Sequence, residues 1–429
     1  MLLKEGTIMN DTARKTHYLA WFMLMFSFFM PAVLLNTVGA VILNLVNQLH
    51  VSMDAASWLE AFKDVSIMVG AFFLASFIPS FGYKRTLIVG ILLEIIGCVL
   101  FAMFPSLFVA RIFFMFCGVG FALIKTTVYA SVGLFVEDLS RHASFFSLLE
   151  GMFMGGVMTG MWIYSFFVSM GDWTTAFWCF GIMCTINLIV VFFVKLDESK
   201  IQHEMKSPKE EMKNDIKGMA SLFKKATVWL FILMAFFYVF IEQGVTTWLP
   251  TFNNKILHIS DALSLQVASL FPAALCLGRF IGALGMRKIN WAKLLFFALI
   301  ISFGIFVIAI FVSIQVSGKG IECLSWSNLP FAALLIPIAG LFIAPVYPTI
   351  CSTIVSSQPS RLHSSMAGVI LLFSALGGTI GSRIVGTLFD QFGGLTAIKA
   401  PLIPIVVLVI LLIPYYKMIK RVIAEKKEL

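Results

Sequence analysis

Charged side chains are scarce in this chain: they make up 12% of its 429 residues, while 60% of the residues are hydrophobic. A water-soluble protein needs charge on roughly a quarter of its residues to cover its surface. The shortage therefore excludes a soluble globular fold. Apolar runs of 18 residues or more recur along the whole length, which indicates a surface that faces lipid.

Motifs for metals, disulfides and nucleotides are missing too. The 7 cysteines show no metal-ligand spacing and no disulfide framework. No Gly-x-x-x-x-Gly-Lys-Ser/Thr motif is present to hold nucleotide phosphates. No cluster of nucleophiles or metal ligands gathers at one membrane face. We therefore expect no cofactor and no metal, and we predict that the protein is not an enzyme.

The apolar runs predict twelve membrane-spanning helices. Each is long enough to cross a hydrocarbon core of ~30 Å at a rise of ~1.5 Å per residue. The first run is too long for a signal peptide, so we interpret it as a retained helix. The predicted spans are 18–46, 55–80, 86–104, 106–135, 144–170, 174–194, 227–250, 262–286, 292–314, 327–355, 363–388 and 396–416.

Lysine and arginine are distributed unevenly over the predicted loops. With the N-terminus in the cytoplasm, 23 of the 31 basic residues fall on the cytoplasmic side, and only Lys255, Lys319 and Lys399 face outside. Such a bias sets the orientation of membrane proteins. The pattern predicts a multi-pass protein with both termini cytoplasmic, and the absence of targeting features fits a bacterial inner membrane. Because the basic residues are dispersed over the loops, it does not indicate nucleic-acid binding.

One long polar stretch divides the chain. Residues 195–226 form a predicted cytoplasmic linker between an N-terminal half of six helices, 1–194, and a C-terminal half of six helices with a short tail, 227–429. An internal repeat supports this division, because Leu-His-Val-Ser at 49–52 is echoed by Leu-His-Ile-Ser at 257–260. The predicted fold class is an all-α membrane protein with two pseudo-symmetric halves, an architecture known among transporters.

Three stretches carry a resemblance to a known family. They are Phe81-Gly82-Tyr83-Lys84-Arg85, then Tyr238-Val239 with Glu242, Gly244 and Trp248-Leu249, and Gly340-Leu341 with Ala344-Pro345 and Tyr347-Pro348-Thr349. Over nearly its whole length the chain resembles the major facilitator superfamily, and most of all its fucose–galactose–glucose proton symporter branch. The resemblance implies the major facilitator fold and transport of a small solute. That branch uses acids in helices one and four, where this chain has Asn36, Asn44 and Lys125.

Charged side chains within the spans are the main candidates for function, because a charge at mid-membrane costs at least ~2.5–3.5 kcal/mol. Depth along the helices suggests pairs of Glu150 with Lys125 or Arg279, and of Asp64 or Glu60 with Arg383. A purely structural pair, or for Trp248 an interfacial anchor, is the alternative. The candidate solute-binding residues are Lys125, Glu242, Trp248, Asn36 and Tyr347. The candidate proton-coupling or gating residues are Glu150, Arg279, Asp64 and Arg383.

The predicted function is secondary active transport by alternating access, since no nucleotide-binding motif supplies energy. The buried acids make a proton the expected coupling ion. By resemblance the solute is a sugar, and the alternative is a small anion such as an organic acid or amino acid, drawn by the basic residues. A membrane-embedded enzyme or a receptor would need a reactive cluster or a soluble domain. We expect a monomer in the lipid bilayer, with a small-molecule solute as its partner.

Overall fold

The computed structural model describes residues 11–74, 78–135, 139–194, 216–318, 320, 322–359 and 362–428. The described chain is almost wholly helical, and its one β-type pairing is an isolated bridge between Ile259 and Cys323. A helix suits a chain in lipid because it satisfies the backbone N–H and C=O groups within the segment. The N-terminal helices are α1 (Asp11–Leu35), α2 (Val38–Leu49), α3 (Met53–Val69), the π-helical turn η1 (Gly70–Leu74), α4 (Ile78–Phe81), α5 (Tyr83–Met103), α6 (Leu107–Phe135), α7 (Leu139–Ser169) and α8 (Thr175–Phe193).

The second half of the chain repeats this architecture. Its helices are α10 (Ala226–Lys255), α11 (Asp261–Ala268), α12 (Leu270–Gly285), α13 (Trp291–Ser317), the 3-10 turn η3 (Trp326–Asn328), α14 (Ala332–Ile343), α15 (Val346–Ser357), α16 (His363–Phe392), α17 (Gly394–Ala397) and α18 (Leu402–Glu428).

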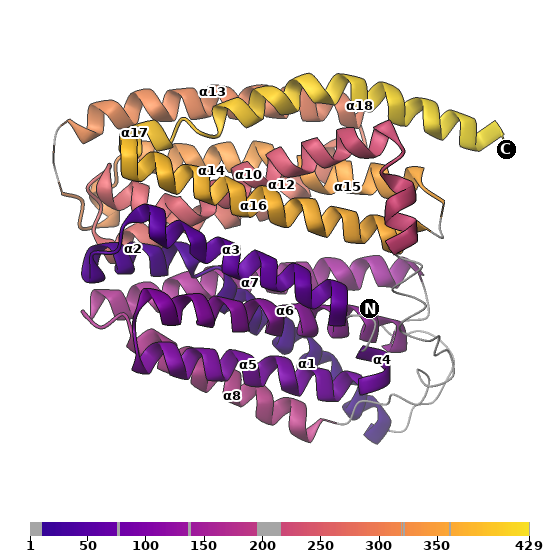
Figure 1. Cartoon of the computed structure of the whole chain (residues 1–429), viewed down its shortest axis with the longest axis horizontal. Coiled ribbons are helices and arrows are strands. Elements are labelled where there is room, and N and C mark those ends of the chain that lie inside the picture. Colours follow the sequence, from indigo (N-terminus) through magenta and orange to yellow (C-terminus); the bar gives the residue numbers. More distant parts are fainter. Residues whose placement is uncertain are drawn as a thin grey trace.

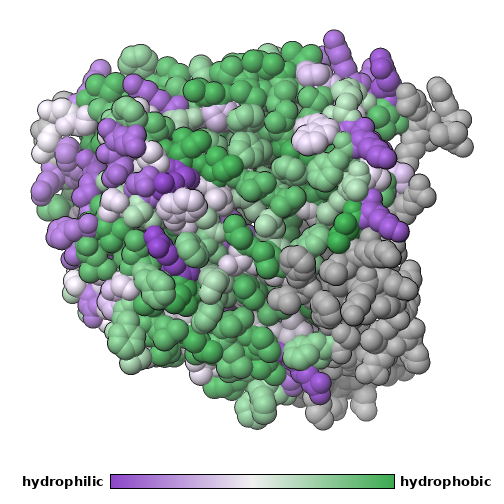
Figure 2. Space-filling view, in the orientation of Figure 1, coloured by the Kyte–Doolittle hydropathy of each residue, from purple (hydrophilic) through white to green (hydrophobic). Residues whose placement is uncertain are grey.

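Eleven helical segments of the described chain are long and apolar enough to cross a membrane. The remaining predicted span, 55–80, corresponds to α3, η1 and α4, and α3 has buried charges in its middle. The predicted all-α, multi-pass membrane fold is thus confirmed. Figure 2 shows apolar residues over the middle of the molecule and hydrophilic residues gathered toward its two ends, as a bilayer requires.

The helices form two bundles that lie side by side (Figure 1). The N-terminal bundle contains α1–α8, and the C-terminal bundle contains α10–α18. We call the end with the connections at 50–52, 170–174 and 256–260 the loop end. The opposite end, where α8 ends and α10 begins, is the linker end. Residues 195–215, most of the predicted linker, lie outside the described residues.

Two turns at the loop end reproduce the repeat in the sequence. His50 and His258 both adopt the left-handed conformation, with φ of 52° and 54°. His50 caps α2 and His258 follows the end of α10 by three residues, and each lies two residues before the serine that precedes the next helix, Ser52 before α3 and Ser260 before α11. The sequence repeat therefore corresponds to a repeated backbone turn, because an unusual φ for a non-glycine residue recurs at the same place.

Polar side chains bridge the two bundles near the loop end. The amide nitrogen of Asn47 on α2 donates to Asn254 Oδ1 at 3.2 Å and to Asp261 Oδ1 at 3.1 Å. The hydroxyl of Ser165 on α7 donates to the Ala262 carbonyl oxygen at 2.8 Å. These bonds tie α2 and α7 of one bundle to α10 and α11 of the other, so the loop end is closed.

A backbone contact reinforces this closure. A Cβ atom on Gly39 of α2 would lie less than 3.0 Å from the Thr247 carbonyl oxygen of α10, where real Cβ atoms essentially never lie. Toward the linker end the arrangement differs. The long helices α1 and α6 pack mainly within the N-terminal bundle, and α15 packs mainly within the C-terminal bundle. Each of these three helices thus makes most of its contacts within its own bundle.

Close packing within the N-terminal bundle leads to a first prediction. A Cβ atom on Gly160 of α7 would lie less than 3.0 Å from the Val33 carbonyl oxygen of α1, whereas one on Gly151 would meet nothing within 4 Å. Gly160→Ala should therefore destabilise the protein by about 1–3 kcal/mol, the usual cost of overpacking. Thermal unfolding in detergent should show a lower midpoint for Gly160→Ala and an unchanged one for Gly151→Ala. Equal midpoints for the two variants would contradict the close packing of α7 on α1.

Candidate functional site

An ion pair joins α10 and α12 inside the helix bundle. Arg279 Nη2 lies 2.8 Å from Glu242 Oε1. The two side chains remain 28% and 19% exposed, so this pair is not sealed in the protein core. The pair is centred on α10, which contacts α2 of the N-terminal bundle as well as α11, α15, α16 and α18 of its own bundle. A carboxylate that accepts and a guanidinium that donates are thus both available to a polar solute.

Two stacked tyrosines extend this cluster. The rings of Tyr238 on α10 and Tyr347 on α15 lie with centroids 5.3 Å apart and planes 20° apart. The Tyr347 hydroxyl is 2.8 Å from the Ser374 hydroxyl of α16. Tyr238 precedes Glu242 by one helical turn, which puts it on the same face of α10. Four helices, α10, α12, α15 and α16, therefore contribute carboxylate, guanidinium and hydroxyl groups to one site.

Lys125 occupies an aromatic environment on α6. Its Nζ atom lies 5.4 Å from the ring centroid of Phe121 and 5.3 Å from that of Tyr129. Both rings pack in turn on Phe28 of α1. No carboxylate of the described side chains forms an ion pair with Lys125. Among the described side chains, cation–π attraction to these two rings is therefore the contact that stabilises the ammonium.

Asn36 lies where the first membrane helix is broken, between α1 and α2. Its amide nitrogen donates to the Ala32 carbonyl oxygen at 3.1 Å, and the side chain is half-buried. The neighbouring Thr37 hydroxyl donates to the Leu34 carbonyl oxygen at 2.6 Å. The break therefore holds polar groups within an otherwise apolar helix, and the side-chain oxygen of Asn36 remains an available acceptor.

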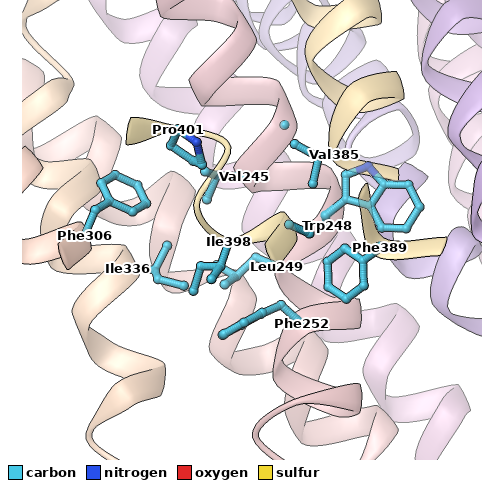
Figure 3. Close-up of a pocket in the computed structure, with 12 residues that line it drawn as sticks. Val245, Trp248, Leu249, Phe252, Phe306, Ile336, Val385, Phe389, Ile398 and Pro401 are labelled. Atoms are coloured by element: carbon cyan, nitrogen blue, oxygen red, sulfur yellow. The ribbon is translucent and has the colours of Figure 1, made fainter. Parts of the chain in front are cut away.

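Trp248 was predicted to be an aromatic platform for the solute, but the structure buries it between helices. It is 1% exposed, and its Nε1 donates to the carbonyl and hydroxyl oxygens of Ser382 at 2.9 and 3.1 Å. Its ring stacks on Phe389 of α16 and lines an apolar pocket of about 30 Å³ with Val385 and Ile398 (Figure 3). This space is too small for a sugar. The contacts are those of a residue that packs α10 on α16, and they also do not fit the alternative of an exposed interfacial anchor.

The predicted partners of Arg383 need correction. Arg383 Nη1 pairs with Asp54 Oδ1 at 2.9 Å and donates to the Ser57 hydroxyl at 3.0 Å. Asp64 instead lies 3.6 Å from Lys63 on its own helix. Equal depth in the membrane suggested Asp64 and Arg383 as partners, but the first turn of α3 brings Asp54 directly against α16. Arg383 thus belongs to the closed loop end.

Glu150 lies on α7, but its side chain is outside the described part of the structure. Its predicted partner Arg279 is paired with Glu242, on the neighbouring helix α10. The described structure therefore leaves the coupling role of Glu150 as a prediction.

Comparison with known proteins places this geometry in a family. Residues 18–382 match the family model of the Major Facilitator Superfamily. The chain belongs to that superfamily. Its members are transporters, so the all-helical fold and the predicted class of function, a transporter rather than an enzyme, are confirmed.

The relatives of this superfamily member include sugar transporters. It is 25% identical over 354 residues to a glucose/galactose transporter of Brucella abortus biovar 1 (strain 9-941), a match that covers 78% of the chain and 80% of the relative. It is 21% identical over 357 residues to a Protein TsgA homolog of Buchnera aphidicola subsp. Acyrthosiphon pisum (strain Tuc7), with 82% and 84% covered.

Solved structures share the fold of this superfamily member. A mutant of the nucleoside transporter NupG superposes with a TM-score of 0.72 at 12% identity, covering 93% of this chain and 99% of that one. A D-xylose-proton symporter superposes with a TM-score of 0.67 at 14% identity, covering 91% and 97%. At these identities the likeness shows the fold alone.

Sequence reasoning placed Glu242, Arg279 and Tyr347 among the candidates, but it missed three features of this superfamily member's site. It did not single out Tyr238 as the stacking partner of Tyr347, and it did not bring Ser374 into the cluster. It also did not pair Glu242 with Arg279. The spacing of Tyr238 and Glu242 on one helix face was a signal in the sequence that Tyr238 belongs to the site. The place of Ser374 and the pairing of Glu242 with Arg279 depend instead on how helices far apart in sequence are rotated against each other.

Proposed function

We propose that this protein is a proton-coupled symporter that moves a small polar solute of the sugar type across the bacterial inner membrane by alternating access. The observation that carries the proposal is the partly exposed cluster of Glu242, Arg279 and Tyr347 around α10, a helix that also contacts α2 of the other bundle. Carboxylate, guanidinium and phenol groups hydrogen-bond sugar hydroxyls, and aromatic rings pack on the apolar faces of a sugar ring. The glucose/galactose transporter and the D-xylose-proton symporter support this class of solute.

The distribution of lysine and arginine supports an orientation with the linker end in the cytoplasm. In this orientation the contacts at the loop end lie on the outer side of the membrane, and alternating access would break them. Solute would contact Glu242 and Tyr347 from the C-terminal bundle, and Lys125 and Asn36 from the N-terminal bundle. The monomer would contain the whole pathway, because both bundles belong to one chain.

The residues assigned to coupling and gating have separate tasks in this proposal. Arg279 holds the Glu242 carboxylate at the solute site, and Arg383 holds the loop end closed through Asp54. Asp64 lies between the bundles, where it can respond to their movement. Glu150 remains a proposed coupling residue on α7.

A small anion is the second candidate solute. The observation that favours it is Lys125, which has aromatic neighbours but no ion-paired carboxylate among the described side chains. A carboxylate of an organic acid or amino acid would neutralise this ammonium directly.

Uptake into proteoliposomes tests the proposal. Purified protein should accumulate radiolabelled D-glucose or D-galactose when the outside is made acidic, and a protonophore should abolish the accumulation. Succinate and glutamate serve as the anionic alternatives in the same assay, with protein-free liposomes as the control. Accumulation of either anion with none of the sugars would reject sugar transport and establish the second candidate.

A further inference from the structure

Three charged side chains lie together on one face of α3. Glu60, Lys63 and Asp64 are all buried, at 0%, 5% and 6% exposure. Lys63 Nζ is ion-paired with Glu60 Oε1 and lies 3.6 Å from Asp64 Oδ1. Residues three and four apart share a helix face, which explains the grouping. The opposite face carries the exposed apolar side chains Trp58 and Phe62, so α3 turns its charges into the protein.

The C-terminal bundle covers this cluster. The Thr247 hydroxyl of α10 donates to Glu60 Oε2 at 3.0 Å. The Thr379 hydroxyl of α16 lies 3.5 Å from Asp64 Oδ2, and a Cβ atom on the adjacent Gly378 would come within 3.0 Å of that same oxygen. The cluster is therefore part of the contact between the bundles, and it loses these neighbours if α3 parts from α10 and α16.

The charges of the cluster do not balance. Two carboxylates face one ammonium, and the charged groups that act on Asp64 are Lys63 and Glu60. The basic side chains on the surrounding helices are engaged elsewhere. Arg383 of α16 pairs with Asp54, Arg279 of α12 pairs with Glu242, Arg111 of α6 lies over the ring of Phe62, and Lys125 of α6 lies over Phe121 and Tyr129. The acids on the two helices that cover the cluster are Glu242 of α10 and Asp390 of α16, which would add negative charge rather than remove it.

An unbalanced negative charge in a buried contact is unfavourable, and a proton on one carboxylate removes it. A metal cation is a poorer neutraliser here, because it would need several of the carboxylate oxygens that Lys63 already engages. Asp64 is the better acceptor of the two acids. It is the more distant from Lys63, whereas Glu60 is ion-paired and also accepts a hydrogen bond from Thr247.

We propose that the Glu60–Lys63–Asp64 cluster is the site that binds the coupling proton, with Asp64 as its acceptor, and that proton binding permits the bundles to close at the loop end. This inference deepens the proposed symport and rests on it. When the loop end is open, the cluster meets water and Asp64 can take a proton from outside. Closure buries the neutral cluster against Thr247 and Thr379. Loss of the proton to the cytoplasm leaves a net charge of −1, which favours reopening toward the outside.

Separate measurements of exchange and accumulation test the assignment. Exchange of radiolabelled D-galactose across proteoliposomes needs no net proton movement, whereas accumulation under a pH gradient does. Asp64→Asn mimics the protonated acid, so it should keep exchange within about twofold of the original protein and lose accumulation by at least about tenfold. Glu94→Gln is the matched control, since Glu94 is also a fully buried acid but lies within the N-terminal bundle on α5. It should retain both activities.

A second measurement does not depend on any solute or on the folding of Asp64→Asn. Fluorophores attached to p-acetylphenylalanine at positions 49 and 324, where the exposed Leu49 and Leu324 lie on the loop ends of the two bundles, report their separation by energy transfer. In the otherwise unchanged protein, raising the pH should shift the population toward the larger separation. In Asp64→Asn the distribution between the two separations should no longer change with pH.

The outcomes separate this inference from the proposed function. Full accumulation by Asp64→Asn, or accumulation driven by a sodium gradient instead of a pH gradient, would overturn the proton site and leave sugar transport standing. A separation between positions 49 and 324 that does not change with pH would also overturn the proton site. A third outcome is also informative. In it the unchanged protein fails to accumulate D-galactose and still shows the pH-dependent change in separation, with Asp64→Asn abolishing that change. The proton site then stands and D-galactose symport is rejected.

Discussion

Replacing Arg279 with alanine should reduce solute transport at least tenfold, a loss that corresponds to about 1.4 kcal/mol of binding free energy. Arg279 is the only described basic side chain paired with Glu242, and the pair is still 28% and 19% exposed. Without Arg279, the Glu242 carboxylate loses both its counter-charge and its fixed position. Because the pair is partly exposed, unfolding should be less affected than transport. The initial rate of exchange in proteoliposomes and the thermal midpoint in detergent measure the two effects separately.

Two further variants distinguish a solute site from a structural ion pair. Arg279→Lys keeps the charge but loses the planar fork that fixes the carboxylate, so its transport should also fall. The double variant Glu242→Arg with Arg279→Glu exchanges the two charged side chains, so an ion pair can form again with the basic residue on α10 and the acidic residue on α12. It should recover the thermal midpoint without recovering transport, since the solute would meet the two charges in exchanged places. Recovery of both would show that the pair only holds α10 to α12.

The helices of this protein could be predicted from sequence because lipid leaves the backbone few alternatives. Apolar runs long enough to cross a bilayer became helices, and even the charged span 55–80 was recognised, as α3 with η1 and α4. The repeat of Leu-His-Val-Ser and Leu-His-Ile-Ser also had a structural counterpart, the two left-handed turns at His50 and His258.

The partners of the charged side chains were harder to predict. A rise of ~1.5 Å per residue gives the depth of a side chain but not the direction in which its helix turns it. Asp64 and Arg383 were expected together by depth. In the structure Arg383 reaches Asp54 at the start of α3, while Asp64 is held by Lys63 next to it in the sequence. The sequence signal for the cluster was the spacing of Glu60, Lys63 and Asp64, which a depth comparison between helices does not use.

The candidate solute residues show the same limit. Glu242 and Tyr347 lie on α10 and α15, which contact each other, and the ring of Tyr347 stacks on that of Tyr238. Trp248 belongs to the same helix as Glu242, but six residues turn it to a different side, against Ser382 and Phe389. A sequence motif thus identifies which helix contributes to the site. The direction in which each side chain on that helix points depends on how the neighbouring helices pack against it.

Replacing Gly39 with tryptophan should abolish transport while leaving the protein folded. Gly39 of α2 meets the backbone of Thr247 on α10 so closely that even a Cβ atom would not fit. This contact lies between the two bundles, so a large side chain can be accommodated if the loop end opens. The variant should therefore be held open at the loop end, which alternating access does not tolerate. Exchange should fall to the level of protein-free liposomes, and energy transfer between positions 49 and 324 should report the larger separation at all pH values.

A tryptophan at Gly160 provides the matched control. Gly160 has an equally close backbone neighbour, Val33, but both residues belong to the N-terminal bundle and do not separate in a rocking movement. Gly160→Trp has no open state to relieve the clash, so it should lower the yield of folded protein and the thermal midpoint. Gly39→Trp should keep both near the original values, because one state of the cycle accepts it. If Gly39→Trp also fails to fold, or if it folds and transports normally, then the contact between α2 and α10 does not open during transport, and the loop end is not the outer gate.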